Sequence, residues 1–181
     1  MTKHAVIVVD VLNEFVDGLV GRPHAINVIE PCQKIIAAAR DLKVPVIYTN
    51  DAHNDNDIEL AIWGPHAMKG TEGAMVHDGV APQDGDIIIE KHNYSGFFKT
   101  ELDETLKGLG VDSLVVVGLY SNICCRLTCV DAFQHGYKVT IAREAMTSFD
   151  EAAYEGDLEY LKIVAGAEAV SVDEAIALLS A

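Results

Sequence analysis

Apolar runs recur along the chain and alternate with stretches of helical spacing. Several of the runs are apolar at every position and rich in β-branched residues, a pattern typical of strands that are buried on both faces. We expect strands at residues 5–10, 44–51, 86–91, 113–119 and 137–143, with a short edge strand at 167–171. The segments between them predict helices at residues 27–43, 99–110, 124–136, 151–166 and 172–181.

The alternation of strands and helices is the pattern of a parallel sheet with helices on both faces. We therefore predict an α/β fold: a single doubly wound domain over residues 1–181 with a mostly parallel sheet. Half of the 181 residues are hydrophobic, enough for one substantial core. The exception to the regular pattern is segment 52–85, which is polar and rich in Gly, His and Asp. Loops of this length in compact domains are usually functional.

The chain is strongly acidic, with 28 acidic and 13 basic residues and a formal net charge of −15. Such a surface repels phosphate backbones and anionic lipids, so we expect no nucleic-acid or membrane partner. The N-terminal stretch MTKHAVIVVDVLNEF does not resemble a signal peptide, and no run is apolar enough to span a membrane. Four cysteines without an export signal predict free thiols and a cytoplasmic location.

Reactive side chains follow four of the predicted strands, at the point where each strand ends. They are Asp10, Asp51 with His53 two residues later, Lys91 and Cys124. Parallel strands bring their carboxyl ends to one edge of the sheet, where ligands bind, so these residues are candidates for one site. Taken alone, Asp10 is better explained as a helix N-cap and Lys91 as a surface lysine. Together, an acid, an amine and a thiol favour catalysis.

Three of the four cysteines fall in the stretch GLYSNICCRLTCVDA. Ser121 or Asn122 is a candidate N-cap for the helix that begins near Cys124. Cys124 would then lie in the first turn, where free backbone N–H groups and the helix dipole stabilise a thiolate.

The other cysteines are better explained by packing. Cys125 and Cys129 are four residues apart and share a helix face that continues to Ala132 and Phe133, so we expect them to be buried. Cys32 lies in a different helical pattern, and we expect it in the core. A zinc site would need a second ligand cluster near these thiols, and a disulfide within one helical run is geometrically poor.

Segment 52–85 and the strand before it contain a second group of candidate ligands, within DAHNDNDIELAIWGPH. Asp51, His53 and His66 are typical ligands of a divalent transition metal, and Glu59 is a candidate fourth ligand. The spacing Asp-x-His is a weak signal by itself, because histidines in polar loops are often only solvated. A bound metal and a solvated loop both remain open on spacing alone.

Four segments of the chain occur in a specific order: IVVDVLNEF, NDAH…WGPHAMKGTEGA, EKHNYSGFFKTEL and VVGLYSNICCRLTCVDAFQHGYKV. In this order they resemble the cysteine hydrolases of the isochorismatase-like superfamily, which includes nicotinamidases and N-carbamoylsarcosine amidases. The resemblance covers nearly the whole chain. It implies a catalytic set of Asp10, Lys91 and Cys124, a metal loop with zinc as the first candidate, no organic cofactor, and a homo-oligomer.

The resemblance also implies a reaction. Asp10 would accept the proton of Cys124, and Lys91 would hold the ion pair in place. The thiolate would attack a small carboxamide or N-carbamoyl compound, form a thioester and release ammonia. The backbone N–H groups of Tyr120 and Cys124 would form the oxyanion hole, with a cis peptide bond between Leu119 and Tyr120.

Two aromatic residues match positions that flank a flat substrate in nicotinamidases. They are Phe15 and Trp63, and core packing is the alternative for each. The chain also departs from the family pattern: Ser121-Asn122 replaces a common Thr-Asp, and Glu59 replaces a histidine found in many nicotinamidases. Two other functions stay open at this stage. One is isochorismatase-type hydrolysis, which a cysteine at position 124 disfavours, and the other is a non-catalytic thiol scaffold for redox sensing or binding.

Overall fold

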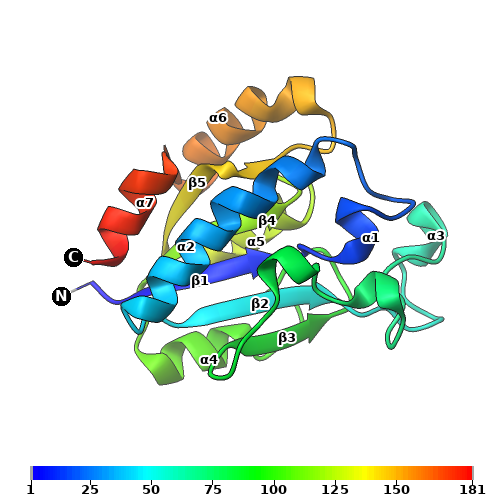
Figure 1. The fold of residues 1–181 in the computed structure, drawn as a ribbon, viewed down its shortest axis with the longest axis horizontal. Coiled ribbons are helices and arrows are strands. Elements are labelled where there is room, and N and C mark those ends of the chain that lie inside the picture. The colour runs from blue at the N-terminus through cyan, green and yellow to red at the C-terminus, as the bar shows by residue number, and fades with distance from the viewer. Residues whose placement is uncertain (1, 181) are drawn as a thin grey trace.

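The computed structural model describes residues 2–180, which form a six-stranded sheet covered by helices (Figure 1). The strands are β1 (His4–Val9), β2 (Val46–Asp51), β3 (Ile87–Lys91), β4 (Ser113–Leu119), β5 (Lys138–Thr147) and β6 (Glu168–Val170). Their order is β3-β2-β1-β4-β5-β6, and every neighbouring pair is parallel. This confirms the predicted α/β fold.

Helices cover both faces of the sheet. One face carries α1 (Asn13–Val16), α2 (Ile29–Asp41) and α7 (Val172–Leu179), and the other carries α4 (Leu102–Leu109), α5 (Cys124–Gln134) and α6 (Tyr154–Ala165). Alternate residues of β1 divide between the two cores: Val6 and Val8 pack on one side, and Ile7 and Val9 on the other. Strands with apolar residues at every position are therefore buried on both faces, as the sequence pattern predicted.

The strands point toward the side of the molecule on which α1 and α3 (Leu60–Trp63) lie, while both chain ends lie at the opposite side (Figure 1). Strands β1 and β4 approach each other closely at this end. Gly118 has a φ of 117°, and a Cβ atom at this position would meet the carbonyl oxygen of Val9 at 2.1 Å. Only glycine fits there, and the close approach brings the residues after β1 and β4 side by side.

Segment 52–85 contains more regular structure than its polar composition predicted. It forms α3 and two 3-10 turns, η2 (Glu72–Ala74) and η3 (Asp78–Val80); further 3-10 turns are η1 (Ala25–Val28) and η4 (Glu151–Ala153). The segment folds back on itself, because the N–H of His53 donates to the carbonyl of Ala67 and the N–H of Lys69 donates to that of His53. This pairing brings the two ends of the candidate metal loop together.

Several expectations about packing were wrong. Phe133 is 51% exposed, because the buried face of α5 turns away from it after Ala132. Strand β3 is half-exposed and not buried on both faces, because it lies at the edge of the sheet. Helix α1 was not predicted, since four residues are too few for a periodic signal.

No helix within residues 2–180 is long and apolar enough to cross a membrane.

Candidate active site

The side chains predicted at the strand ends meet in the structure. Lys91 Nζ lies 2.7 Å from Asp10 Oδ2 and donates a hydrogen bond of 2.5 Å to Asp51 Oδ1. Oxygens of Asp10 and Asp51 and the Sγ atom of Cys124 all lie within 4.8 Å of one another. All four residues are buried, and they lie at or after the ends of the adjacent strands β3, β2, β1 and β4. The strand order therefore places an acid, an amine and a thiol at one point.

Asp10 directly follows β1 and has a left-handed backbone conformation, with φ of 49°. Its Oδ1 accepts a hydrogen bond of 2.7 Å from the backbone N–H of Asp51. Helix α1 begins after Leu12, and no side chain caps it. The N-cap explanation of Asp10 was wrong, and Lys91, which is fully buried, is not a surface lysine.

Lys91 is the cation of this cluster and lies between two carboxylates, those of Asp10 and Asp51. Burial acts to lower the pKa of Lys91, but the carboxylates of Asp10 and Asp51 outweigh it and hold that pKa well above its usual value. Burial would raise the pKa of Asp51, yet the charge of Lys91 and the nearby imidazole of His53 keep it lowered. Burial, together with the nearby charge of Asp51, raises the pKa of Asp10 to about 6. Lys91 is thus a permanent cation, and of its two carboxylate partners Asp10 takes up a proton more readily than Asp51.

Cys124 is the first residue of α5 and is 6% exposed. Burial raises the pKa of its thiol well above the ordinary value, and the attraction of Lys91 only partly opposes this. Burial therefore opposes the stabilisation of a thiolate that was expected from the helix N-terminus. The thiol is neutral at rest, and its proton needs an acceptor, for which Asp10 is in place.

The turn before α5 is not capped by Ser121 or Asn122, so that expectation was wrong. Ile123 occupies the N-cap position without a side-chain hydrogen bond. Ser121 instead donates to Asp157, and Asn122 accepts from the backbone N–H of Phe149.

The remaining cysteines have the packing role that the sequence predicted. Cys125, Cys129 and Cys32 are fully buried free thiols, with Cys125 and Cys129 in the core beneath α5.

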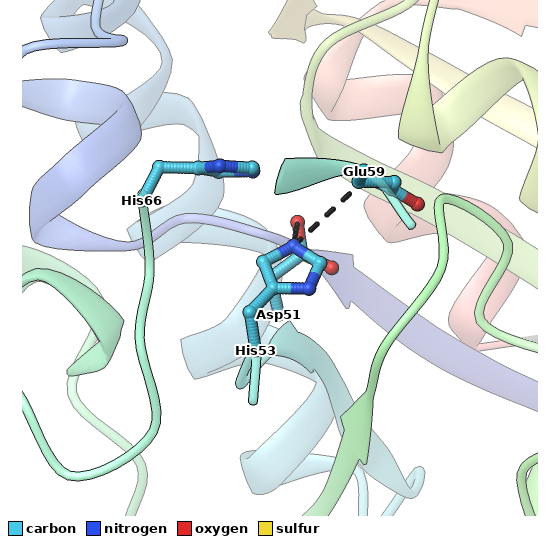
Figure 2. Close-up of side chains that lie close together, drawn as sticks. All are labelled: Asp51, His53, Glu59 and His66. Carbon is cyan, nitrogen blue, oxygen red and sulfur yellow. Dashed lines mark ion pairs between the residues drawn. The ribbon is translucent and has the colours of Figure 1, made fainter. Parts of the chain in front are cut away.

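The candidate metal ligands also converge. Asp51, His53, Glu59 and His66 are all buried, and one ligand atom from each lies within 4.8 Å of those of the others (Figure 2). His53 Nε2 is 3.6 Å from Asp51 Oδ2 and 3.9 Å from Glu59 Oε2. Burial and the charge of Asp51 raise the pKa of Glu59 to about 7. Two carboxylates and two imidazoles at this spacing form a suitable donor set for a divalent transition metal.

The hydrogen bonds of the histidines support this assignment. His53 Nδ1 lies 3.2 Å from Asp57 Oδ2, and His66 Nδ1 lies 2.8 Å from the carbonyl of Gly64. Among the described residues, no hydrogen-bond partner is present for the buried atoms His53 Nε2 and Glu59 Oε1. Buried polar atoms normally have a partner, and a metal ion between the four side chains would supply one.

The second acidic group around Cys124 does not call for a metal. Asp10, Asp51 and Cys124 also offer ligand atoms within 4.8 Å of one another. Lys91, however, already contacts both carboxylates and supplies a positive charge between them. A protein cation thus occupies the place that a metal ion would take.

A narrow pocket lies between the thiol and the candidate metal ligands, with an enclosed volume of about 20 Å³. Its lining residues are Asp10, Phe15, Val20, Asp51, Glu59, Trp63, His66, Tyr94, Leu119, Tyr120, Ile123, Cys124 and Phe149. Phe15 and Trp63 line it as the family resemblance implied, although Phe15 also packs in the core. This volume is small, so the walls must move apart when a ring-sized ligand enters.

Two aromatic residues of the pocket, Tyr94 and Phe149, were not predicted. The hydroxyl of Tyr94 accepts a hydrogen bond of 3.1 Å from Trp63 Nε1, and the ring of Phe149 packs edge-on against Trp63 at 5.5 Å. Tyr94 lies three residues after Lys91, and Phe149 two residues after β5. The rule that reactive or lining residues follow strand ends would have found both, had the end of β5 been predicted correctly.

Comparison with known proteins agrees with this geometry. Residues 4–174 match the isochorismatase domain family. The structure of an N-carbamoylsarcosine amidase from Thermoplasma acidophilum is similar with a TM-score of 0.91 at 38% identity, covering 95% of this chain and 98% of that one. The pyrazinamidase of Pyrococcus horikoshii, solved in complex with zinc, has a TM-score of 0.84 at 28% identity, covering 93% and 99% of the two chains.

Curated proteins give the same family. Nicotinamidase 3 of Arabidopsis thaliana is 31% identical over 161 residues, which cover 85% of this chain and 78% of that protein. The chain spans about half the length of the first curated relatives that it matches, for example 52% of the isochorismatase of Bacillus subtilis. Members of the family are hydrolases, including amidases such as nicotinamidase and N-carbamoylsarcosine amidase. The match over residues 4–174 shows that the chain belongs to the isochorismatase family, as its four sequence motifs predicted.

Proposed function

We propose that the protein is a cysteine-dependent amidohydrolase that cleaves a small carboxamide or an N-carbamoyl compound. The observation that carries this proposal is the contact of Asp10 and Lys91 beside the buried thiol of Cys124, at the wall of a small pocket. These are a base, a fixed cation and a nucleophile in mutual reach. The amidases among the similar structures support the same reaction class.

In the first half of the reaction, Asp10 takes the proton of Cys124 as the sulfur attacks the amide carbon. A bond forms between sulfur and carbon, and the carbonyl oxygen becomes an oxyanion. Asp10 then gives the proton to the amine nitrogen, the C–N bond breaks, and ammonia leaves from a thioester. Lys91 stays protonated throughout and keeps the Asp10 carboxylate in position.

In the second half, water replaces ammonia. Asp10 accepts a proton from the water, whose oxygen attacks the thioester carbon. The C–S bond breaks, the acid product leaves, and the sulfur of Cys124 recovers its proton from Asp10. A base whose pKa is raised to about 6 suits both halves, because it can accept and return a proton near neutral pH.

The oxyanion would be held by the backbone N–H groups of Tyr120 and Cys124. Within residues 2–180, neither N–H donates a hydrogen bond to another residue. The peptide bond between Leu119 and Tyr120 is cis, as the resemblance implied. Two free N–H groups beside the nucleophile are the usual composition of an oxyanion hole.

Asp51, His53, Glu59 and His66 would hold a divalent metal, with zinc as the first candidate. The fit rests on the converging donors and on the unpartnered atoms His53 Nε2 and Glu59 Oε1. When bound, such an ion offers a Lewis-acid position for a nitrogen or oxygen atom of the substrate. The similar pyrazinamidase in complex with zinc supports this choice of metal.

The aromatic walls of the pocket would hold a flat substrate between Phe15 and Trp63, with Tyr94 fixing the indole. Nicotinamide and N-carbamoyl compounds both agree with these walls. The thiol-scaffold alternative is less well supported, since redox-sensing cysteines are exposed and have a lowered pKa, whereas Cys124 is buried and its pKa is raised. A cytoplasmic location and a homo-oligomeric state remain part of the proposal.

Ammonia release tests the function directly. The zinc-loaded protein is incubated with nicotinamide, pyrazinamide and N-carbamoylsarcosine, and ammonia is measured with a coupled assay. We expect release from at least one of them, and none from the Cys124→Ala variant. Absence of release from the whole panel, combined with rapid oxidation of Cys124 by peroxide, would favour the thiol scaffold instead.

A further inference from the structure

We infer that Asp57 is a positioning residue for the candidate metal site, because it fixes the tautomer and orientation of His53. The inference rests on the proposed metal site but not on the identity of the substrate. Asp57 lies four residues after His53 and is outside the set of candidate ligands. Its Oδ2 atom lies 3.2 Å from His53 Nδ1 and 3.0 Å from His92 Nδ1, and accepts a hydrogen bond of 2.8 Å from the N–H of Asn54.

The local turn explains why this carboxylate faces His53. The N–H of Asp57 donates 3.0 Å to the carbonyl of Asn54, while the N–H of Asn54 donates to the side chain of Asp57. This reciprocal pair closes the turn directly after His53. The Asp57 side chain is only 17% exposed, so its position does not depend on surface contacts alone.

An ionised carboxylate only accepts hydrogen bonds. The Oδ2 atom of Asp57 already accepts the backbone N–H of Asn54, so it acts as an acceptor in this turn. The ring nitrogen of His53 that faces Asp57 must therefore carry its hydrogen, which leaves the lone pair of neutral His53 on Nε2. That atom faces Asp51 and Glu59 and has no partner among the described residues.

Without Asp57, the neutral ring would have a competing arrangement. Its hydrogen could move to Nε2 and be donated to the carboxylate of Asp51, now 3.6 Å away, after a small rotation of the ring. That hydrogen bond would occupy the position of the metal ion. The ring of His66 does not depend on a side chain in this way, because its Nδ1 atom is paired with the backbone carbonyl of Gly64. The orientation of His53 thus depends on a side chain, which makes it testable by substitution.

The chain offers a matched control in His92. Its Nδ1 atom lies 3.0 Å from the same oxygen of Asp57, but the side chain is 41% exposed and is not one of the four candidate ligands. His92→Asn removes a neighbour of Asp57 and leaves the contact between Asp57 and His53 intact. Asp57→Ala removes the acceptor itself.

The first measurement is zinc affinity, by competition with a chelating dye, for the full-length wild type, Asp57→Ala and His92→Asn. Loss of such an outer hydrogen bond typically weakens metal binding about 10–100-fold, which we expect for Asp57→Ala, with His92→Asn within about twofold of wild type. Thermal melts check that each variant is folded. A folded Asp57→Ala protein with wild-type zinc affinity would overturn the inference.

The second measurement needs neither metal nor substrate. Nitrogen-15 NMR of the metal-free protein, at a pH where His53 is neutral, reports which ring nitrogen carries the hydrogen. We expect Nδ1–H in the wild type and in His92→Asn, and Nε2–H in Asp57→Ala. If His53 keeps Nδ1–H in Asp57→Ala, the positioning role is wrong. If the wild-type protein binds no zinc, the proposed metal site and the positioning role of Asp57 are both wrong. If the wild type binds zinc but releases no ammonia from the amide panel, the proposed function is wrong, and the zinc and NMR results on Asp57 still hold.

Discussion

Ser121 donates a hydrogen bond of 2.7 Å to Oδ2 of Asp157, and this contact joins the turn before Cys124 to helix α6. Both residues are buried. Arg126 donates 2.7 Å to the other oxygen of the same carboxylate. The turn that would supply the oxyanion hole is therefore attached through Asp157 to a segment far along the chain.

Ser121→Ala removes this attachment. We expect a loss of about 1–3 kcal/mol in the free energy of unfolding, because Oδ2 of Asp157 stays buried without its donor, together with a fall in kcat. Arg126→Met is the matched control, since it removes the other partner of the carboxylate and leaves Ser121 in place. Urea unfolding and steady-state kinetics separate the two effects. Equal kcat values for the two variants would mean that the attachment serves stability alone.

The neighbouring cysteines should respond oppositely to substitution. Cys124→Ala should abolish turnover and leave the fold intact, because it removes only the nucleophile. Cys125→Ala, at a fully buried position in the core beneath α5, should keep turnover and lose about 1 kcal/mol of stability. Ammonia release and thermal melting measure the pair. Turnover retained in Cys124→Ala would contradict the assignment of the nucleophile.

Lys91 should matter far more for stability than a surface lysine does. Lys91→Met leaves Asp10 and Asp51 buried without a cation, for which we expect a loss of about 3–5 kcal/mol in the metal-free protein. Lys69→Met breaks the pair with Glu90, in which both side chains are about half-exposed, and should change stability by less than about 1 kcal/mol. Urea denaturation compares the two. A loss for Lys91→Met as small as for Lys69→Met would contradict the central role of this cation.

The pKa of Asp10, raised to about 6 by burial and by Asp51, predicts the acid side of the pH profile. Asp10 accepts the thiol proton only when it is ionised, so kcat/KM should fall about tenfold per pH unit below about pH 6. Protonation of Asp10 has the opposite effect on stability. The folded state binds the proton of Asp10 more tightly than the unfolded chain does. The stabilisation from this proton is therefore present at low pH and is lost as the pH rises through about 6. Zinc content is followed in parallel, and a profile that follows zinc loss would assign the acid limb to the metal ligands.

Zinc should stabilise the protein through His66. At a free concentration of one hundred times Kd, a ligand that binds only the folded state adds about 2.7 kcal/mol, which corresponds to a rise in Tm of about 5–10 °C for a chain of this size. His66→Ala should lose this response and His77→Ala should keep it, because His77 lies outside the four candidate ligands and pairs with Asp17. Scanning calorimetry with and without a chelator measures the shift. An undiminished shift in His66→Ala would exclude His66 as a ligand.

The sequence was sufficient to predict that these four side chains lie together because that prediction depended on topology. Apolar runs show where strands end, and parallel strands place those ends at one edge, so Asp10, Asp51, Lys91 and Cys124 could be grouped without side-chain detail. The buried faces of the helices followed from periodicity in the same way.

Side-chain partners between distant segments could not be predicted in this way. Serine or asparagine before a helix is a local signal for an N-cap, but Ser121 instead satisfies a buried carboxylate on α6. Strand β5 continues through the polar residues Arg143 and Glu144, where the apolar pattern breaks, so Phe149 was not expected at a strand end. Asp57 could have been noticed as an acid four residues after a candidate ligand, yet only the closed turn shows that it faces His53.

Lys91 lies on β3, one of the two edge strands of the sheet. Edge strands have a partner on one side only and are usually the first to open in native-state fluctuations. Here, opening of the edge would withdraw the cation from Asp10 and Asp51 and leave like charges side by side in the interior. Detachment of β3 is therefore penalised electrostatically as well as by lost backbone pairing. We therefore expect this end of β3 to open only together with the central strands β1 and β4. Hydrogen exchange at the Lys91 end of β3 should then be as slow as in those central strands.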